Sequence, residues 1–178
     1  MPESSTILDS RQTLRALRRM AGEIVEKAGG GEDLVLVGIR TRGVPIAESF
    51  AEQIEASEGH RPPVGLLDIT LYRDDLSTIG PQPVVKETRI PVSIDGRVVV
   101  LCDDVLFTGR TIRAALDALA DYGRPKAVKL AVLIDRGHRE LPIQADVVGR
   151  TVEIRRDQEV QVRLESVDGD TRVEVVAA

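Results

Sequence analysis

The sequence is poor in aromatic residues and cysteine: it has no tryptophan, two phenylalanines, two tyrosines and one cysteine in 178 residues. Aliphatic side chains must therefore build the core, and a site made by stacking aromatic rings on nucleobases is disfavoured. The lone Cys102 cannot form an intramolecular disulfide, so nothing indicates an oxidising compartment. Its position inside an apolar run predicts a buried thiol and not a nucleophile.

The sequence also lacks long apolar segments. No stretch approaches the roughly 20 apolar residues of a membrane helix, and the N-terminus has no signal-peptide centre. We therefore expect a cytoplasmic protein with no membrane partner. The net charge of −5 argues against wrapping of nucleic acid by the whole surface, although a local basic patch stays open. The length fits a single domain over residues 1–178.

Apolar periodicity predicts three helices. Residues 9–27 place Leu14, Leu17, Ala21 and Ile24 on one stripe, with Asp9 or Ser10 as the N-cap. A second helix is predicted from Pro45 toward Gly59, and a third over residues 109–122.

Four β-branched apolar runs are typical of buried strands. They cover residues 33–39, 64–72, 97–103 and 127–135. Strands that alternate with helices predict an α/β fold with a mainly parallel sheet flanked by helices. An alternating segment around Asp168 and Gly169 predicts a C-terminal antiparallel β-hairpin.

Two adjacent carboxylates stand at the end of the third strand, in the segment "VVVLCDDVLFTGRTI". The turn at Thr108, Gly109 and Thr111 offers hydroxyls and the free amides of a helix N-terminus, which suit a phosphate. Asp103 and Asp104 can accept hydrogen bonds from vicinal hydroxyls or hold a hydrated metal ion. Strand, acids, turn and helix together predict a site for a phosphorylated sugar. The segment has neither the Walker A pattern nor a dinucleotide fingerprint.

Basic residues outside this motif could bind a second anion. The turn "RTR" at residues 40–42 follows the first strand at the same edge of the sheet, although arginines in a turn can also be merely solvated. The stretch of residues 73–92 has three prolines and no helical period, which predicts a lid over the site at about residues 72–90. Its basic residues Arg73, Lys86 and Arg89 are candidates for ligand contact, and we favour Arg73 and Arg89.

The motif resembles the phosphoribosyl pyrophosphate (PRPP) motif of type I phosphoribosyltransferases. The segments "LVGIRTRGVPIAE", "LDITLYRDDL" and "LAVLIDRGHRELPIQADVVG" further resemble the PyrR family, over residues 7–149. That resemblance implies the type I fold with a hood over the base at about residues 135–150 plus the C-terminal hairpin. It assigns the ribose hydroxyls to the catalytic acids Asp103 and Asp104 and the 5′-phosphate to residues 108–111. The implied PRPP/UMP-binding set is Thr41, Arg42, Asp103, Asp104, Val105, Leu106, Phe107, Thr108, Gly109, Arg110 and Thr111.

By the same resemblance the protein is a uracil phosphoribosyltransferase that forms UMP and pyrophosphate from uracil and PRPP. Mg²⁺ is expected to be held mainly by PRPP, with no metal site made by the protein alone. The implied base-binding residues are Arg136, Gly137, His138 and Val160. His138 could be a catalytic base or a polar loop residue, and both interpretations stay open. The segment "DRGHRELP" speaks against a purine salvage enzyme.

The resemblance also implies regulation of pyrimidine genes through UMP- or UTP-dependent binding to leader mRNA, which is transcription attenuation, and a homodimer or higher homo-oligomer. The candidate RNA contacts lie on the polar side of the first helix, a pattern that from spacing alone is more typical of a solvated face. They are Arg11, Arg15, Arg18 and Arg19. The chain lacks the family's Pro-Thr-Ser turn after the hood, and Gly22 replaces a common histidine. The alternative is an RNA-binding, nucleotide-sensing regulator with little or no transferase activity.

Overall fold

The computed structural model describes residues 3–75 and 85–178. The elements up to the lid are β1 (Ser5–Leu8), α1 (Ser10–Lys27), β2 (Leu34–Ile39), α2 (Gly43–Glu58), β3 (Val64–Leu67) and the 3-10 turn η1 (Thr70–Tyr72). Those after the lid are β4 (Val98–Leu106), α3 (Arg110–Ala120), β5 (Ala127–Asp135), β6 (Val147–Thr151), β7 (Gln158–Arg163), α4 (Glu165–Asp168) and β8 (Arg172–Ala177). No helix in these ranges is long and apolar enough to cross a membrane.

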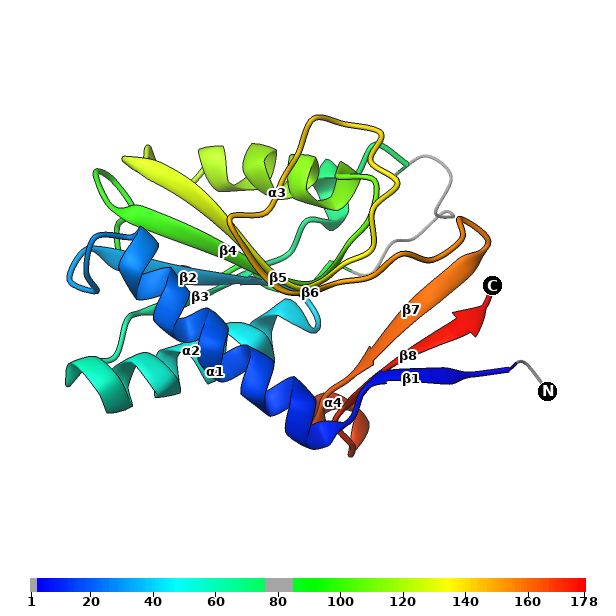
Figure 1. Cartoon of the computed structure of the whole chain (residues 1–178). Coiled ribbons are helices and arrows are strands. Elements are labelled where there is room, and N and C mark those ends of the chain that lie inside the picture. The colour runs from blue at the N-terminus through cyan, green and yellow to red at the C-terminus, as the bar shows by residue number, and fades with distance from the viewer. Residues whose placement is uncertain (1–2, 76–84) are drawn as a thin grey trace.

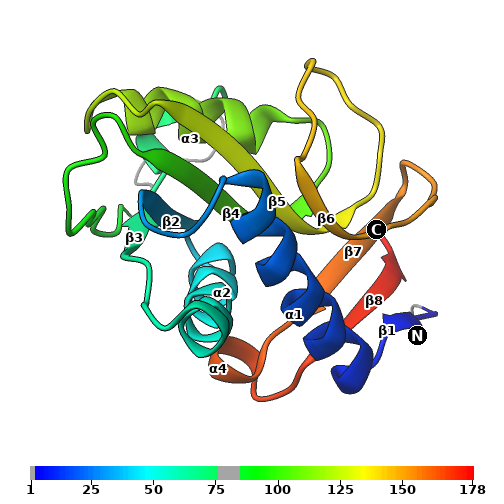
Figure 2. The ribbon, with the colours of Figure 1, turned by 60° about the vertical axis from the view of Figure 1, so that its left-hand side comes forward.

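Five parallel strands form the central sheet, in the order β3-β2-β4-β5-β6. Helices α1 and α2 cover one face and α3 covers the other (Figures 1 and 2). The apolar residues of β2 alternate between the two faces, so that Leu36 packs toward α1 and α2 while Val37 packs toward α3. The predicted parallel sheet flanked by helices is therefore confirmed.

A second, antiparallel sheet has the order β1-β8-β7. It lies beside the N-terminal half of α1 (Figure 1). Val160 and Val173 from this sheet share one core with Leu17 and Met20 of α1. The C-terminal hairpin is confirmed, and its connection contains the four-residue helix α4, with Gly169 as its C-cap.

Helix α1 begins where the sequence predicts. The side chain of Asp9 accepts a hydrogen bond from the backbone N–H of Gln12, and the Gln12 side chain accepts one from the backbone N–H of Asp9. This capping box satisfies two amides at the start of the helix. The predicted place of Leu14 in the buried stripe is wrong, because its side chain is 52% exposed while Leu17 and Ala21 are buried.

Several predicted bounds differ from the structure. The strand predicted over residues 64–72 ends at Leu67, because the Asp68 carboxylate accepts hydrogen bonds from the backbone and hydroxyl of Thr70 and so starts η1. The strand predicted to end at Asp103 continues to Leu106. The short strands β1 and β6 carry no clear alternation and were not predicted.

Candidate active site

The two adjacent acids lie within β4 near its carboxyl end, where it pairs with β5. Asp103 is 7% exposed, and one of its carboxylate oxygens accepts a hydrogen bond of 2.9 Å from the backbone N–H of Asp104. The Asp104 side chain in turn accepts a hydrogen bond of 2.8 Å from the backbone N–H of Val105. Burial, followed by the charge of Asp104, raises the pKa of Asp103 well above its usual value. Asp103 is therefore a poorly solvated carboxyl poised for a partner.

The turn after β4 leads directly into α3. Gly109 is the N-cap at φ 94°, and the backbone N–H of Arg110 donates to the Thr108 hydroxyl at 3.3 Å. Glycine suits this backbone angle, and a Cβ atom at Gly109 would lie 3.1 Å from Ile143, so a larger residue would also require Ile143 to shift. A cavity of about 200 Å³ opens at this helix start. Its lining comprises Thr108, Arg110, Thr111, Arg73, Asp74 and Asp75.

The predicted anion-binding turn joins β2 to α2 and lies next to the acids, because β2 and β4 are neighbours. A Cβ atom on Gly43 would lie 2.2 Å from the carbonyl oxygen of Cys102, so only glycine lets this turn pack against β4. The peptide bond between Arg40 and Thr41 is cis. Thr41 and Arg42 share a cavity of about 380 Å³ with Asp103, Asp104 and Thr111.

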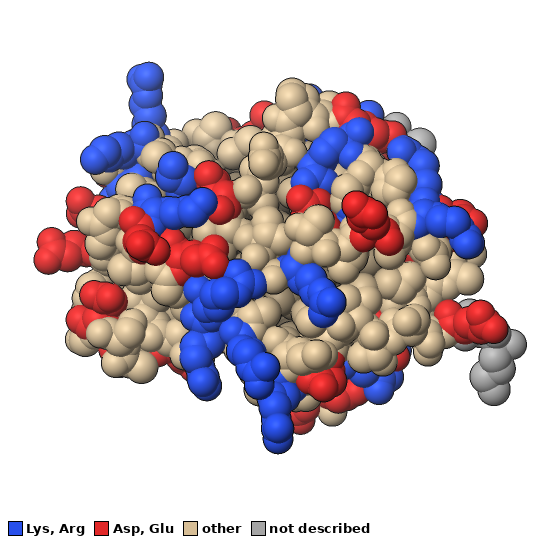
Figure 3. Space-filling model, viewed as in Figure 1, with Lys and Arg blue, Asp and Glu red and all other residues tan. Residues whose placement is uncertain are grey.

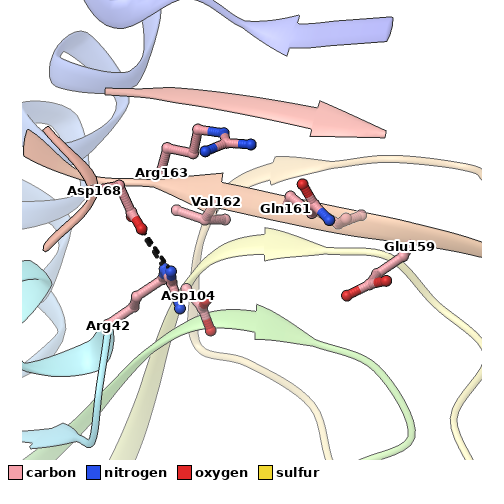
Figure 4. A pocket seen from close by; sticks show the side chains of 8 residues that line it. Arg42, Asp104, Glu159, Gln161, Val162, Arg163 and Asp168 are labelled. Atoms are coloured by element: carbon pink, nitrogen blue, oxygen red, sulfur yellow. Dashed lines mark hydrogen bonds and ion pairs between the residues drawn. The ribbon is translucent and has the colours of Figure 1, made fainter. Parts of the chain in front are cut away.

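A third cavity, of about 360 Å³, separates this edge of the central sheet from β7 (Figure 4). Arg42 and Asp104 line it as well, so it adjoins the previous cavity. The Arg42 guanidinium contacts both carboxylate oxygens of Asp168, at 2.7 and 3.3 Å. These hydrogen bonds raise the pKa of Arg42 and lower that of Asp168. Val160, a predicted base-binding residue, lies in the same wall.

The other predicted base-binding residues follow β5. Arg136 is 4% exposed and donates to the carbonyl oxygens of Gln158 and Arg155. The backbone N–H of Gly137 donates to Asp135 at 3.0 Å. His138 is exposed, and its Nε2 donates to the carbonyl oxygen of Ile154 at 2.7 Å. This hydrogen bond ties His138 to the hood.

Arg110 connects three parts of the site through its side chain. Its guanidinium pairs with Asp74 at 2.8 Å, on the lid, and with Glu140 at 3.1 Å, on the hood. Arg156 pairs with the other oxygen of Glu140 at 2.5 Å. Hydrogen bonds from Arg110 and Arg156 lower the pKa of Glu140. The structure thus places the predicted phosphate contact Arg110 among carboxylates, and its backbone N–H, more than its charge, faces the turn.

The predicted lid lies partly outside the described residues, which omit residues 76–84. Arg73 lines both the cavity at α3 and the cavity at the acids, and it pairs with Asp75 at 2.7 Å. Arg89 forms a two-way backbone bridge with Leu66 of β3 and lines neither cavity. The structure therefore brings Arg73, but not Arg89, to the acids.

Sequence reasoning missed several lining residues. Asp68 lines the cavity at the acids, and although burial opposes its ionisation, hydrogen bonds from Thr70 and Lys86 outweigh burial and lower its pKa. The sequence pattern indicates Asp168 only as a turn residue of the hairpin. The run "LDIT" could have indicated Asp68, because it places a carboxylate at the end of a strand in the same sheet.

The candidate RNA-binding arginines are all exposed on α1. Arg19 pairs with Glu23 and donates to the carbonyl oxygens of Val148 and Gly149 on β6. Within residues 3–75 and 85–178, the side chains of the other three candidates make no hydrogen bond or ion pair. The structure thus separates one anchored arginine from Arg11, Arg15 and Arg18.

A phosphoribosyl transferase domain model matches residues 3–168. The "Bifunctional protein PyrR" of Pelotomaculum thermopropionicum is 58% identical over 98% of this chain and 96% of its own length, and the protein of that name from Thermus aquaticus is 57% identical over 95% and 93%. A crystal structure of hypoxanthine-guanine phosphoribosyltransferase from Bacillus anthracis matches with a TM-score of 0.73 at 18% identity, covering 98% of each chain.

These matches, the parallel sheet and the acids at its edge define a phosphoribosyltransferase of the type I fold. Within that class, the chain belongs to the PyrR family, at 57–58% identity to relatives over nearly its whole length.

Proposed function

We propose that the protein transfers ribose 5-phosphate from PRPP to uracil, with release of pyrophosphate, and that it also binds leader RNA to regulate pyrimidine genes. One observation supports the transferase half above all. The acids at Asp103 and Asp104, the turn at Thr41 and Arg42, and the start of α3 at Thr111 line a single cavity. PRPP needs partners for hydroxyls, a pyrophosphate and a 5′-phosphate, and this cavity offers all three kinds.

In this proposal each segment of the site binds one part of PRPP. The amides and hydroxyls at the start of α3 take the 5′-phosphate, because free N–H groups and the helix dipole favour an anion there. Asp103 and Asp104 accept hydrogen bonds from the ribose hydroxyls. Thr41 and Arg42 take the pyrophosphate, and Arg73 adds positive charge from the lid side.

The chemistry is a displacement at the ribose carbon that carries pyrophosphate. The bond to pyrophosphate breaks ahead of the bond to the uracil nitrogen, so positive charge develops on the sugar. The carboxylates Asp103 and Asp104 stabilise that charge, and Arg42 stabilises the charge on the leaving group. No nucleophilic side chain is required, because catalysis rests on position and electrostatics.

Mg²⁺ fits this site as a companion of PRPP. The described residues contain no group of three or more His, Cys, Asp or Glu side chains arranged to hold a metal ion. Asp68, Asp103 and Asp104 nevertheless supply hard oxygen donors along the cavity. When bound, Mg²⁺ would offset negative charge on pyrophosphate.

The choice of base rests on the PyrR family and on the hood. Val160 gives the cavity beside β7 one apolar wall, and Arg136, which the family resemblance assigns to the base, is a buried donor bonded to the nearby carbonyl oxygen of Gln158. An apolar wall with a few fixed donors suits a small pyrimidine with carbonyl acceptors. The related folds include hypoxanthine-guanine enzymes, but identity near 18% carries the fold alone.

The transferase half is tested by incubating the protein with PRPP, Mg²⁺ and either uracil or hypoxanthine. UMP formation with uracil, and a kcat/KM at least 100-fold lower with hypoxanthine, would support the proposal. An absence of UMP would contradict it and leave the nucleotide-sensing regulator as the better interpretation. Asp103→Asn, for which we expect much lower turnover, serves as the low-activity reference.

The regulatory half rests on the PyrR family and on the free arginines of α1. UMP or UTP would promote binding of leader RNA, and a homodimer or higher oligomer would present more than one α1 helix. A gel-shift titration with the leader of the chain's own pyrimidine genes, with and without UMP, tests this half. Binding no tighter than to a scrambled RNA would contradict it.

A further inference from the structure

Arg136 is a buried cation without a carboxylate partner among the described residues. Its side chain is 4% exposed, and it donates to two backbone carbonyls, at 2.8 Å to Gln158 and 3.2 Å to Arg155. Its Nε has no hydrogen-bond partner. Burial, and then the nearby charge of Arg156, lower the pKa of Arg136. A buried guanidinium in this position needs another source of stabilisation.

The ring of Phe107 supplies that stabilisation. The Arg136 guanidinium carbon lies 3.7 Å from the ring centroid. The guanidinium of Arg156 lies 5.8 Å from the same centroid, and the His138 ring meets it edge-on at 6.3 Å and 88°. A cation over an aromatic face is attracted by the ring quadrupole, most strongly where water is excluded.

Phe107 also belongs to the phosphate turn, whose backbone carbonyls accept hydrogen bonds from residues of the hood. Arg139 donates to the Phe107 carbonyl at 2.9 Å. The backbone N–H groups of Glu140 and Leu141 both donate to the Thr108 carbonyl, at 2.9 and 3.1 Å. Phe107 does not line the cavity at the start of α3. Its backbone therefore lies in the phosphate turn while its ring packs against the guanidinium of Arg136.

We propose that Phe107 is a positioning residue for Arg136: its ring holds the guanidinium in place for the base and links the phosphate turn to the base pocket. This inference rests on the proposed function, in which Arg136 contacts uracil. The family resemblance assigns Phe107 to the PRPP-binding set, but in this proposal its side chain affects uracil binding indirectly, because it positions Arg136.

Phe107→Leu keeps an apolar side chain but removes the aromatic face. The KM for uracil is expected to rise about 5- to 30-fold, the range of a desolvated cation–π contact, while the KM for PRPP changes less than twofold. In titration calorimetry, Phe107→Leu is expected to weaken binding of UMP by the same factor. Its affinity for ribose 5-phosphate, which lacks the base, should not change. Phe107→Tyr, which keeps the ring, restores the KM for uracil.

Phe50→Leu is the matched control, because Phe50 is the chain's other phenylalanine and is fully buried on the inner face of α2. It is expected to lower stability and leave the ratio of the two KM values unchanged. Equal losses for uracil and PRPP in Phe107→Leu, an unchanged KM for uracil, or no recovery with Phe107→Tyr would overturn the inference. If the wild type forms no UMP and binds UMP no tighter than ribose 5-phosphate, the proposed function itself fails and the inference falls with it.

Discussion

At the scale of single residues, the site places a carboxyl where ionisation is unfavourable. Asp103 is enclosed by β4 and β5 and lies beside the second acid Asp104. The ionised carboxylate of Asp103 is fully stabilised only when the hydroxyls of a ligand donate hydrogen bonds to it. Without a ligand, this buried charge lowers the free energy of unfolding, and ligand binding offsets the loss. The carboxylate that serves function therefore reduces stability at this position.

Asp103→Asn is expected to stabilise the ligand-free protein at neutral pH and to abolish most activity. Because burial places the folded-state pKa of Asp103 above the unfolded value, the folded state binds the proton more tightly, and stability falls as pH rises between the two values. The uncharged asparagine removes this loss of stability. The stability gained by the substitution should therefore shrink as pH falls toward the pKa of Asp103 in the unfolded state. Turnover should fall about 10- to 150-fold, the worth of a hydrogen bond to a charged group.

Urea denaturation at several pH values, together with UMP formation, measures both effects. Asp117→Asn, which removes an exposed carboxylate on α3, is the control and should change neither. A stability gain that is independent of pH would contradict the assigned role of burial.

Asp168 fixes the direction of Arg42, and removing it should weaken use of PRPP. In Asp168→Asn the guanidinium loses its carboxylate partner, so it no longer faces the cavity in one orientation. We expect kcat/KM for PRPP to fall about fivefold, since the pair is partly exposed and worth about 1 kcal/mol. The KM for uracil should stay constant.

Steady-state kinetics with each substrate varied measures this split. Asp170→Asn, which breaks the neighbouring surface pair with Arg172, is the matched control. Tighter use of PRPP by Asp168→Asn would show that Asp168 competes with pyrophosphate for Arg42.

At the scale of elements, the sequence predicts those whose burial leaves a local pattern. The fully buried β2 reads as a continuous apolar run, and α1 and α3 show helical periodicity closed by caps. β1 and β6 are short strands whose existence depends on distant partners, β8 and β5. No local pattern encodes such pairing, so these strands escape sequence analysis.

The junction between β4 and α3 depends on Gly109, and Gly109→Ala should destabilise it. The alanine would adopt a positive φ and also place its Cβ against Ile143. We expect the free energy of unfolding to fall by about 2 kcal/mol or more, and PRPP binding to weaken with it.

Gly96→Ala is a matched control, because Gly96 has φ 70° with nothing within 4 Å of the added Cβ. It should lose about 1 kcal/mol, from backbone strain alone. Chemical denaturation of both variants isolates the contact with Ile143, and Ile143→Ala should recover part of the loss in Gly109→Ala. Equal losses in the two glycine variants would contradict the role of the hood contact.

At the scale of the whole molecule, the candidate site combines predictable and unpredictable parts. The acids and the phosphate turn are contiguous in sequence, so one motif indicates them. The ion pairs that surround them join residues far apart in the chain, as when Arg110 meets both Asp74 and Glu140, or Arg42 meets Asp168. Sequence alone assigns these arginines to ligand phosphates because their carboxylate partners become visible only in the fold.

Charge is distributed unevenly over the surface, although the net charge is −5. Basic side chains gather over α1 in the view of Figure 3. They are interspersed with acidic groups elsewhere on that face. Any binding of RNA must therefore be local, and it must depend on the arginines that have no carboxylate partner.

The double variant Arg15→Ala/Arg18→Ala should weaken leader-RNA binding and reduce its salt dependence. Each phosphate contact that is lost removes one released counterion, so the slope of log affinity against log salt should fall by about 1.5 for the pair. Arg124→Ala/Lys126→Ala removes the same charge between α3 and β5 and should leave binding unchanged. Filter binding between about 50 and 200 mM salt measures both slopes. Equal losses in the two double variants would show that net charge, and not the face of α1, attracts RNA.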